Sequence, residues 1–537
     1  MSSVLRASSL GLTPSDIEYN LNETFCSITD LLGNELAPDY ILMIDEIKVE
    51  ERPRLDALTG KVLGICREHG GRVALSIDSL KEIEHLVDAV DKKEVHVASE
   101  CTVIAIGLLS PDKRLYAARP FVISGTCKHE RSKEDTQLLQ TVMQVCQQLA
   151  PKLGLGRLVC LTSDGEARRG ASFSDLTLIK PIQPNSALFP LLSGLQLFNT
   201  LVGEDDLTGD KDYKHIFKRL RNLLKGSLGT FIDGVHITPA VLRLHLGDCG
   251  VAKTRIDSML RPDDKQDVTL AAQLLRSVSS IPGPDSNAKP AYARSRRALN
   301  LLGILVDLVI KPYMDISLTL SEQLEHLSAA AHLALWLYVC LTKATRFLPI
   351  QLYGDIMIMI KNAYICFAKA KVKTPKAHFG SSYLLASRLS NATTCANILA
   401  EHPEWDRAPR RLKLRSIDSS AATITSGVDH ISPGVWRGDV RVEHVHPLTT
   451  WRSGRKLLRK ILPDAIATVV EDLLTTLSNS PSIDILSPFG ELILSRLQDS
   501  TPAGIAPTNI NYTVDSLNLL RVGVQCQDPV VSLLCCP

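Results

Sequence analysis

The pattern of apolar and polar residues predicts a sheet in the first third of the chain. Short apolar runs that favour strands cover residues 40–49, 62–65, 72–77, 102–109, 115–125 and 157–162. Polar and apolar residues at helical spacing predict a helix over residues 132–149, and the charged stretch 78–100 also has helical character. Strands mixed with helices in this order predict an α/β fold, in which helices cover a central sheet.

The pattern becomes mostly helical between about residue 205 and residue 400. Long helical regions are expected at residues 297–341 and 349–372, after a linker rich in Pro, Gly, Ser and Asn at 281–292, and a further helix is expected at 457–477. Asp307 and His332 interrupt the two most apolar windows. A membrane span needs roughly 18 uninterrupted apolar residues, so these windows predict buried helices and no membrane segment.

Composition narrows the class of protein only modestly. The chain has 537 residues, which corresponds to about two to four domains. Its net charge of +2 argues against a dominant, strongly basic DNA-binding module, so nucleic-acid binding would depend on local basic surfaces. The 13 cysteines show no pairing at zinc spacing, and neither a disulfide framework nor a zinc site is predicted. The first residues carry no apolar signal segment, and we expect a protein of the nucleus or cytoplasm that is not secreted.

Two acidic residues stand at the ends of predicted strands. Asp45 ends the apolar run 41–45, where a carboxylate is costly to bury without a partner, and it could instead be exposed or paired with Lys48. Asp164 ends a second apolar run and precedes Gly165, where it could simply cap the turn into a following helix.

Together the two acids predict a metal site. Carboxylates that meet on neighbouring strands repel each other unless a divalent cation lies between them, and oxygen ligands suit Mg²⁺ or Mn²⁺. Two such ions about 3.5–4 Å apart hold the attacking and leaving oxygens of a phosphodiester displacement, as nucleases and transposases require.

A third feature lies on a predicted helix that begins near Asp212. His215, Lys218 and Asn222 share one helical face, and Arg221 lies beside them. Side chains of these types position phosphates without reading base sequence. A solvated amphipathic helix would show the same pattern, because leucines supply an apolar face opposite.

The order of these motifs resembles one transposase family. The pattern Asp212-x-x-His215-x-x-Lys218-x-x-Arg221-Asn222 is similar to the signature of P-element and THAP-type DDE transposases, and residues 40–500 resemble the transposase-like proteins of basidiomycete fungi.

The resemblance implies a fold, a reaction and roles for the residues. It implies an RNase H-like mixed sheet flanked by helices, with a large all-helical insertion domain. It also implies cleavage and strand transfer of DNA with Mg²⁺ or Mn²⁺, and self-association by analogy. Asp45 and Asp164 would be the first two metal ligands, and His215, with Asp212, would lie near the site. The phosphate or DNA contact candidates are Lys218, Arg221 and Asn222.

The same resemblance suggests domain boundaries. They are a lead-in at 1–38, the first part of the RNase H-like core at 39–224, the helical insertion at 225–395, the remainder of the core and C-terminal region at 396–500, and a tail at 501–537. No Gly-x4-Gly-Lys-Ser/Thr loop occurs in the sequence, so nucleotide binding by the insertion is not carried over.

The chain departs from the family pattern in two ways. The family's third acid is not found, because residues 356–400 contain no Asp or Glu and the abrupt stretch 373–386 stands where the motif is expected. Glu325 fits a solvated helix face better, and Glu401 and Glu404 are weaker candidates. The family's N-terminal zinc-dependent domain also has no counterpart, since only Cys26 and no histidine precede Asp45. We therefore predict an impaired transposase-like protein, or alternatively a non-catalytic remnant that binds DNA or protein partners.

Overall fold

A five-stranded mixed sheet forms the centre of the N-terminal half. The computed structural model describes residues 13–26, 37–56, 60–110, 118–129, 131–262, 267–340, 347–376 and 438–493. The strand order is β5-β4-β1-β6-β9. The strands are β1 (Tyr40–Lys48), β4 (Glu100–Leu108), β5 (Arg119–Thr126), β6 (Leu158–Ser163) and β9 (Thr208–Lys211). Strand β4 pairs antiparallel with both β1 and β5, whereas β6 and β9 run parallel to β1. This order confirms the predicted RNase H-like mixed sheet.

Helices cover both faces of this sheet. Alternate residues of β1 point to opposite faces: Tyr40, Leu42 and Ile44 enter one apolar cluster, while Ile41 and Met43 enter another. The first cluster includes residues of α1 (Pro14–Cys26), α6 (Ser132–Leu149) and α7 (Ala167–Thr177). Helix α6 has the predicted bounds, because its buried residues recur every three or four positions.

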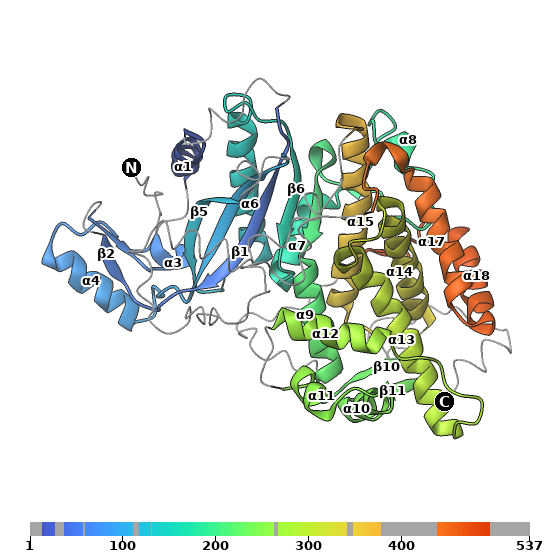
Figure 1. Cartoon of the computed structure of the whole chain (residues 1–537). Helices are drawn as coiled ribbons and strands as arrows, with labels where there is room; N and C mark the ends of the chain where they lie inside the picture. Colours follow the sequence, from blue (N-terminus) through green and yellow to red (C-terminus); the bar gives the residue numbers. More distant parts are fainter. Residues whose placement is uncertain are drawn as a thin grey trace, which may run out of the picture.

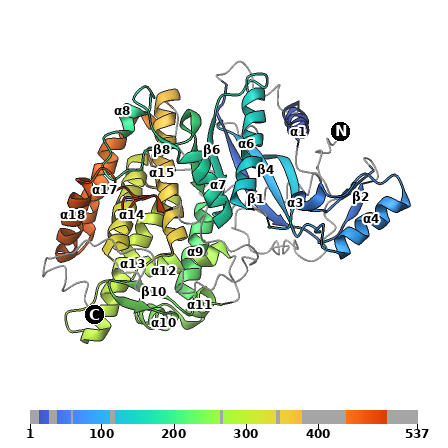
Figure 2. The same ribbon diagram turned by 180° about the vertical axis from the view of Figure 1, so that it is seen from behind.

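The opposite side of the sheet contacts the C-terminal half through α15 (Ile350–Lys373). The ammonium group of Lys369 donates a hydrogen bond to the carbonyl of Val159 on β6, at 2.7 Å. In Figures 1 and 2, α15 accordingly lies between β6 and the other C-terminal helices.

A small lobe projects beyond the sheet, at the side of the molecule where Figure 1 labels β2 and α4. It contains β2 (Arg54–Asp56), β3 (Lys61–Leu63), α3 (Arg67–Gly70) and α4 (Leu80–Asp91). Residues 62–65 and 72–77 therefore do not join the central sheet as predicted. Strand β3 pairs with β2, and Ser76 forms only an isolated bridge to Lys61. Their apolar side chains pack in a separate cluster with α4.

The second half of the described chain forms a helical body around one apolar cluster. Its main helices are α9 (Tyr213–Lys225), α10 (Pro239–Asp248), α11 (Lys253–Met259), α12 (Val268–Ser279), α13 (Pro290–Met314), α14 (Leu320–Cys340), α15, α17 (Pro447–Ile461) and α18 (Asp464–Ser478). Short elements complete it: β7 (Lys180–Pro181), α8 (Phe189–Leu192), β8 (Leu201–Val202), η1 (Glu204–Asp206), β10 (Thr230–Ile232), β11 (Val235–Ile237) and η5 (Val442–His444).

The predicted helices of this half are confirmed in type but differ in their boundaries. The expected helical region 297–341 is two helices, which a turn after Met314 separates. The expected helix 457–477 is also two, because Pro463 has no N–H to continue the helical ladder. Helix α15 matches its prediction within a residue at each end. None of the described helices is long and apolar enough to cross a bilayer.

Candidate active site

The sheet brings the two predicted acids together. Strands β1 and β6 are parallel neighbours, and Ile44 stands opposite Ser163, so the next residues, Asp45 and Asp164, lie side by side. Carboxylate oxygens of Asp45, Glu46 and Asp164 all lie within 4.8 Å of one another. Sites in sheets with parallel strands form at this position, just beyond the carboxyl end of a strand.

Local backbone geometry explains the position of Asp164. Gly165 has φ +89°, a left-handed conformation that a side chain would strain, and it turns the chain from β6 into α7. One oxygen of Asp164 accepts a hydrogen bond from the Glu166 N–H at 3.1 Å. Asp164 therefore caps the turn, as the sequence suggested, but only one of its two carboxylate oxygens makes this hydrogen bond.

The two acids have pKa values shifted in opposite directions. Burial, and then the negative charge of Asp164, raise the pKa of Asp45 to about 7. Burial also acts to raise the pKa of Asp164, but His215, the Glu166 N–H, Lys211 and Arg219 outweigh it, and the pKa of Asp164 is lowered. The pair thus holds one ionised carboxylate beside one that resists ionisation.

The third member of the group, Glu46, is held by arginines. Its Oε1 lies 2.5 Å from a guanidinium nitrogen of Arg169 and 3.9 Å from Arg168. Arg169 is fully buried and also pairs with the buried Asp135. This oxygen of Glu46 is therefore committed to an internal ion pair.

Helix α9 places a histidine and a lysine near the acids. Asp212 caps the helix, because its Oδ1 accepts a hydrogen bond from the Lys214 N–H at 2.9 Å, and its Oδ2 lies 2.8 Å from Nδ1 of His215. His215 lies close enough to favour the ionised forms of Asp45 and Asp164. Burial lowers the pKa of Lys218, although Asp212, Asp164 and Asp45 oppose that shift. The structure thus brings His215 and Lys218 toward the paired acids, while their roles stay predictions.

Arg221 corrects the predicted set of DNA contacts. It is fully buried, and its Nε donates a hydrogen bond to the carbonyl of Met259 at 2.9 Å. Its guanidinium group therefore binds the helical body from inside and cannot reach a phosphate in this packing. Asn222 is half-buried on the next position of α9, and its role stays a prediction.

Sequence reasoning missed Asp355 and Arg219, which lie next to the paired acids. Asp355, on α15, lies 2.5 Å from Nη1 of Arg219 and 3.9 Å from Nζ of Lys211, one cation for each of its oxygens. Arg219 and Gln351 both donate hydrogen bonds to the carbonyl of Gly165. The signal in the sequence was that Asp355 is the one acidic residue of a largely apolar helix.

Asp355 is not in the acidic group, and both of its oxygens already face cations. Glu325 lies on α14 and is not in the acidic group. Glu401, Glu404 and most of the stretch 373–386 lie outside the described residues. Within the described part of the chain, the acidic group therefore contains Asp45, Glu46 and Asp164 and no further carboxylate.

Comparison with known proteins reveals a structural likeness and no match in sequence. No family model matches the sequence, and no curated protein matches it significantly. Among solved structures, the chain is similar to the Drosophila P element transposase strand transfer complex, with 14% sequence identity and a TM-score of 0.40. The alignment covers 84% of this chain and 92% of that one. The strand order and directions are by themselves those of an RNase H-like sheet.

Proposed function

We propose that this chain derives from a metal-dependent DNA transposase, that it retains a divalent cation site at Asp45 and Asp164, and that its catalysis is impaired. The observation that carries the proposal is the meeting of these two carboxylates on adjacent parallel strands of an RNase H-like sheet. Such a pair is the minimum framework for metal-dependent cleavage of a phosphodiester.

The donor set fits Mg²⁺ or Mn²⁺. The grouped atoms are carboxylate oxygens, which these hard cations prefer, and no thiolate is among them. Burial, and then the negative charge of Asp164, raise the pKa of Asp45, and a bound cation would favour its ionised form. When bound, such an ion polarises the phosphodiester and lowers the pKa of a bound water or hydroxyl.

The chain's own residues can orient a phosphate at this position. Asp212 holds Nδ1 of His215, which fixes the tautomer and leaves Nε2 for a substrate oxygen. Lys218 adds positive charge on the same face of α9. Both would position the DNA backbone without reading its sequence, as expected for contacts to phosphate.

The proposed impairment follows from the ligand count. One oxygen of Glu46 is held by Arg169, and the two oxygens of Asp355 face Arg219 and Lys211, so neither acid offers a fully free carboxylate to the ion. Two ligands bind a divalent cation more weakly than three. Sequencing the transcript across codons 373–386 would test whether a segment with the third acid has been lost there.

Cation binding by purified full-length protein tests the site directly. We expect Mn²⁺ to bind the wild type, as measured by its paramagnetic resonance spectrum. Asp45→Asn and Asp164→Asn should each weaken binding by about tenfold or more, the scale at which changes around metal ligands act. Asp88→Asn, at an exposed acid on α4, is the matched control and should leave binding unchanged. Equal Mn²⁺ affinity in the wild type and the Asp45→Asn/Asp164→Asn double variant would overturn the proposal.

A cleavage assay then separates an active from an impaired enzyme. We expect little or no nicking of supercoiled plasmid in Mn²⁺, because the third ligand is missing. Nicking that the wild type performs and Asp45→Asn abolishes would show that catalysis is retained.

A second candidate function, DNA binding without catalysis, is favoured by one observation. Helix α17 exposes Arg452, Lys456, Arg459 and Lys460 along one side. If this surface binds DNA, affinity should fall steeply with salt, and Arg452→Ala or Lys456→Ala should reduce the slope of log K against log salt by about one. Sedimentation of the full chain would test the self-association expected by analogy.

A further inference from the structure

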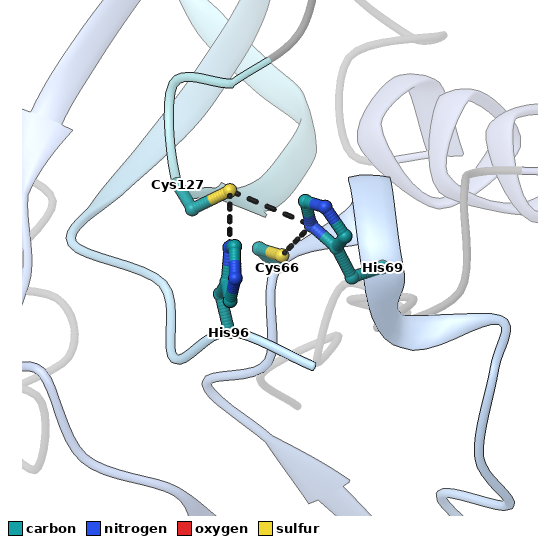
Figure 3. A group of neighbouring side chains, drawn as sticks. All are labelled: Cys66, His69, His96 and Cys127. Carbon is teal, nitrogen blue, oxygen red and sulfur yellow. Dashed lines mark hydrogen bonds between the residues drawn. The ribbon is translucent and has the colours of Figure 1, made fainter. Parts of the chain in front are cut away.

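A second group of metal-ligating side chains lies between the small lobe and the end of β5. It consists of Cys66, His69, His96 and Cys127, whose sulfur and nitrogen atoms all lie within 4.8 Å of one another. Figure 3 shows the four side chains converging from α3 and the residue before it, from the segment that precedes β4, and from the residue that follows β5. None of them belongs to the paired-acid site.

The distances match a tetrahedral zinc site. Zinc bonds of about 2.3 Å to sulfur and 2.0–2.1 Å to nitrogen place neighbouring sulfur and nitrogen ligands roughly 3.6 Å apart. Nδ1 of His69 lies 3.2 Å from the sulfur of Cys66 and 3.6 Å from that of Cys127. Nδ1 of His96 lies 3.5 Å from the sulfur of Cys127. Two thiolates and two imidazoles form one of the usual ligand sets of structural zinc.

Hydrogen bonds hold these ligands in place from several directions. The Cys66 N–H donates to the carbonyl of His96 at 3.0 Å, which joins two of the contributing segments. Arg67 donates to the Thr102 hydroxyl at 3.0 Å, and Glu68 accepts from the Cys127 N–H at 3.2 Å. The two residues between Cys66 and His69 thus anchor that pair to the ends of β4 and β5. Supporting contacts of this kind orient the ligands of natural metal sites.

The apolar cluster of the small lobe is small, so a bound metal ion would add to the stability of the lobe. Its own apolar cluster contains seven buried residues, Val62, Ile65, Val73, Leu75, Leu86, Ala89 and Val95. A core of that size supplies little stability by itself, and small folded units commonly gain the remainder from a bound metal.

We propose that Cys66, His69, His96 and Cys127 bind one structural zinc ion, which fastens the small lobe to the edge of the sheet. All four positions are protein ligands, so the site is closed and has no open position for catalysis. His129 lies outside the four, with Nδ1 3.1 Å from the sulfur of Cys127, where it can donate a hydrogen bond to that ligand. The sequence predicted no zinc site because 2, 26 and 30 residues separate the four ligands, which is unlike the paired motifs of zinc fingers.

Metal content of the full-length protein, purified without added metal or chelator, tests the proposal. We expect native and elemental mass spectrometry to find about one zinc per chain. Cobalt exchanged into the wild type should give visible bands of tetrahedral intensity and a thiolate charge-transfer band in the near ultraviolet. These readouts use the folded wild type, so they do not depend on the folding of any variant.

Variants identify the ligands. Cys66→Ser and Cys127→Ser should each lose most of the zinc, and His96→Gln should lose part or all of it. Cys101→Ser, at a half-buried cysteine on β4, and His85→Gln, at an exposed histidine on α4, are the matched controls and should retain it. His129→Gln should also retain it. Zinc-free wild type, a Cys66–Cys127 disulfide in the purified protein, or zinc that survives both cysteine variants would each overturn the proposal.

Discussion

Arg169 offers the strongest test of how the acidic site is built into the fold. Its guanidinium group is fully buried and bridges Asp135 on α6 and Glu46 on β1, both nearly without exposure themselves. Arg169→Met keeps an unbranched apolar stem but leaves two buried carboxylates without their cation. Removing one partner of a buried ion pair costs about 3–5 kcal/mol, because the remaining charge has lost its compensation.

Hydrogen exchange measured by mass spectrometry is the appropriate assay. All four tryptophans follow residue 330, so tryptophan fluorescence would not report on the sheet. A loss of about 3–5 kcal/mol should speed exchange in peptides from β1 and α6 by roughly 10²- to 10⁴-fold, since each 1.36 kcal/mol corresponds to a factor of ten.

Two further variants control this experiment. Arg243→Met breaks a surface pair with Asp257, in which both side chains are more than 40% exposed, and should change local exchange by less than about tenfold. The double variant Arg169→Met/Asp135→Leu replaces the Arg169–Asp135 contact with an apolar one and should recover part of the lost protection, because Glu46 still lacks its cation. If Arg169→Met leaves β1 and α6 exchange within about tenfold of the wild type, the reasoning about this ion pair is refuted.

Two predictions concern the helical body, where tryptophan fluorescence in urea can follow unfolding. At Gly303 on α13, a Cβ atom would lie 2.6 Å from the carbonyl oxygen of Val278 on α12, so Gly303→Ala should destabilise by about 1–3 kcal/mol. At Gly247 on α10, an added Cβ atom would meet no neighbouring atom within 4 Å, so Gly247→Ala should instead stabilise the protein by up to about 1 kcal/mol. Equal effects at the two sites would contradict the packing argument. Burial lowers the pKa of His332 from its ordinary 6.5 to about 3, so the unfolded chain takes up a proton here first and stability should fall as pH drops below about 6.5. Between about pH 8 and pH 5 the wild type should lose about 2 kcal/mol more than His332→Gln, which does not titrate, and parallel pH profiles for the two proteins would count against this assignment.

The sequence predicted the sheet well where burial imposes a regular pattern. The runs at 40–49, 102–109 and 157–162 are confirmed because strands buried on both faces must be apolar throughout. Strand β9 escaped prediction because Thr208–Lys211 has the pattern of a polar turn, and the side chains of Thr208 and Lys211 find their partners on β6. The runs at 62–65 and 72–77 were wrongly assigned to the central sheet, because a short apolar run does not specify which apolar cluster it joins.

The candidate site was predictable only in part. Asp45 and Asp164 stand out because a lone acid after an apolar run needs a partner, and strand pairing supplied it. The environment of Asp355 could not be read in advance, because Arg219 and Lys211 reach it from other elements. The cysteine and histidine group was equally hidden, since only the folded chain brings Cys66 and Cys127 together.

The carbonyl of Gly165 connects the two halves of the molecule thermodynamically. Arg219 of α9 and Gln351 of α15 both donate hydrogen bonds to it, directly beside Asp164. An occupant that binds Asp164 more tightly when these two helices are docked must, by reciprocity, strengthen their docking by the same factor. For such an occupant, binding at the acidic pair and docking of the helical body on the sheet are linked equilibria, and a change that weakens one should be measurable at the other.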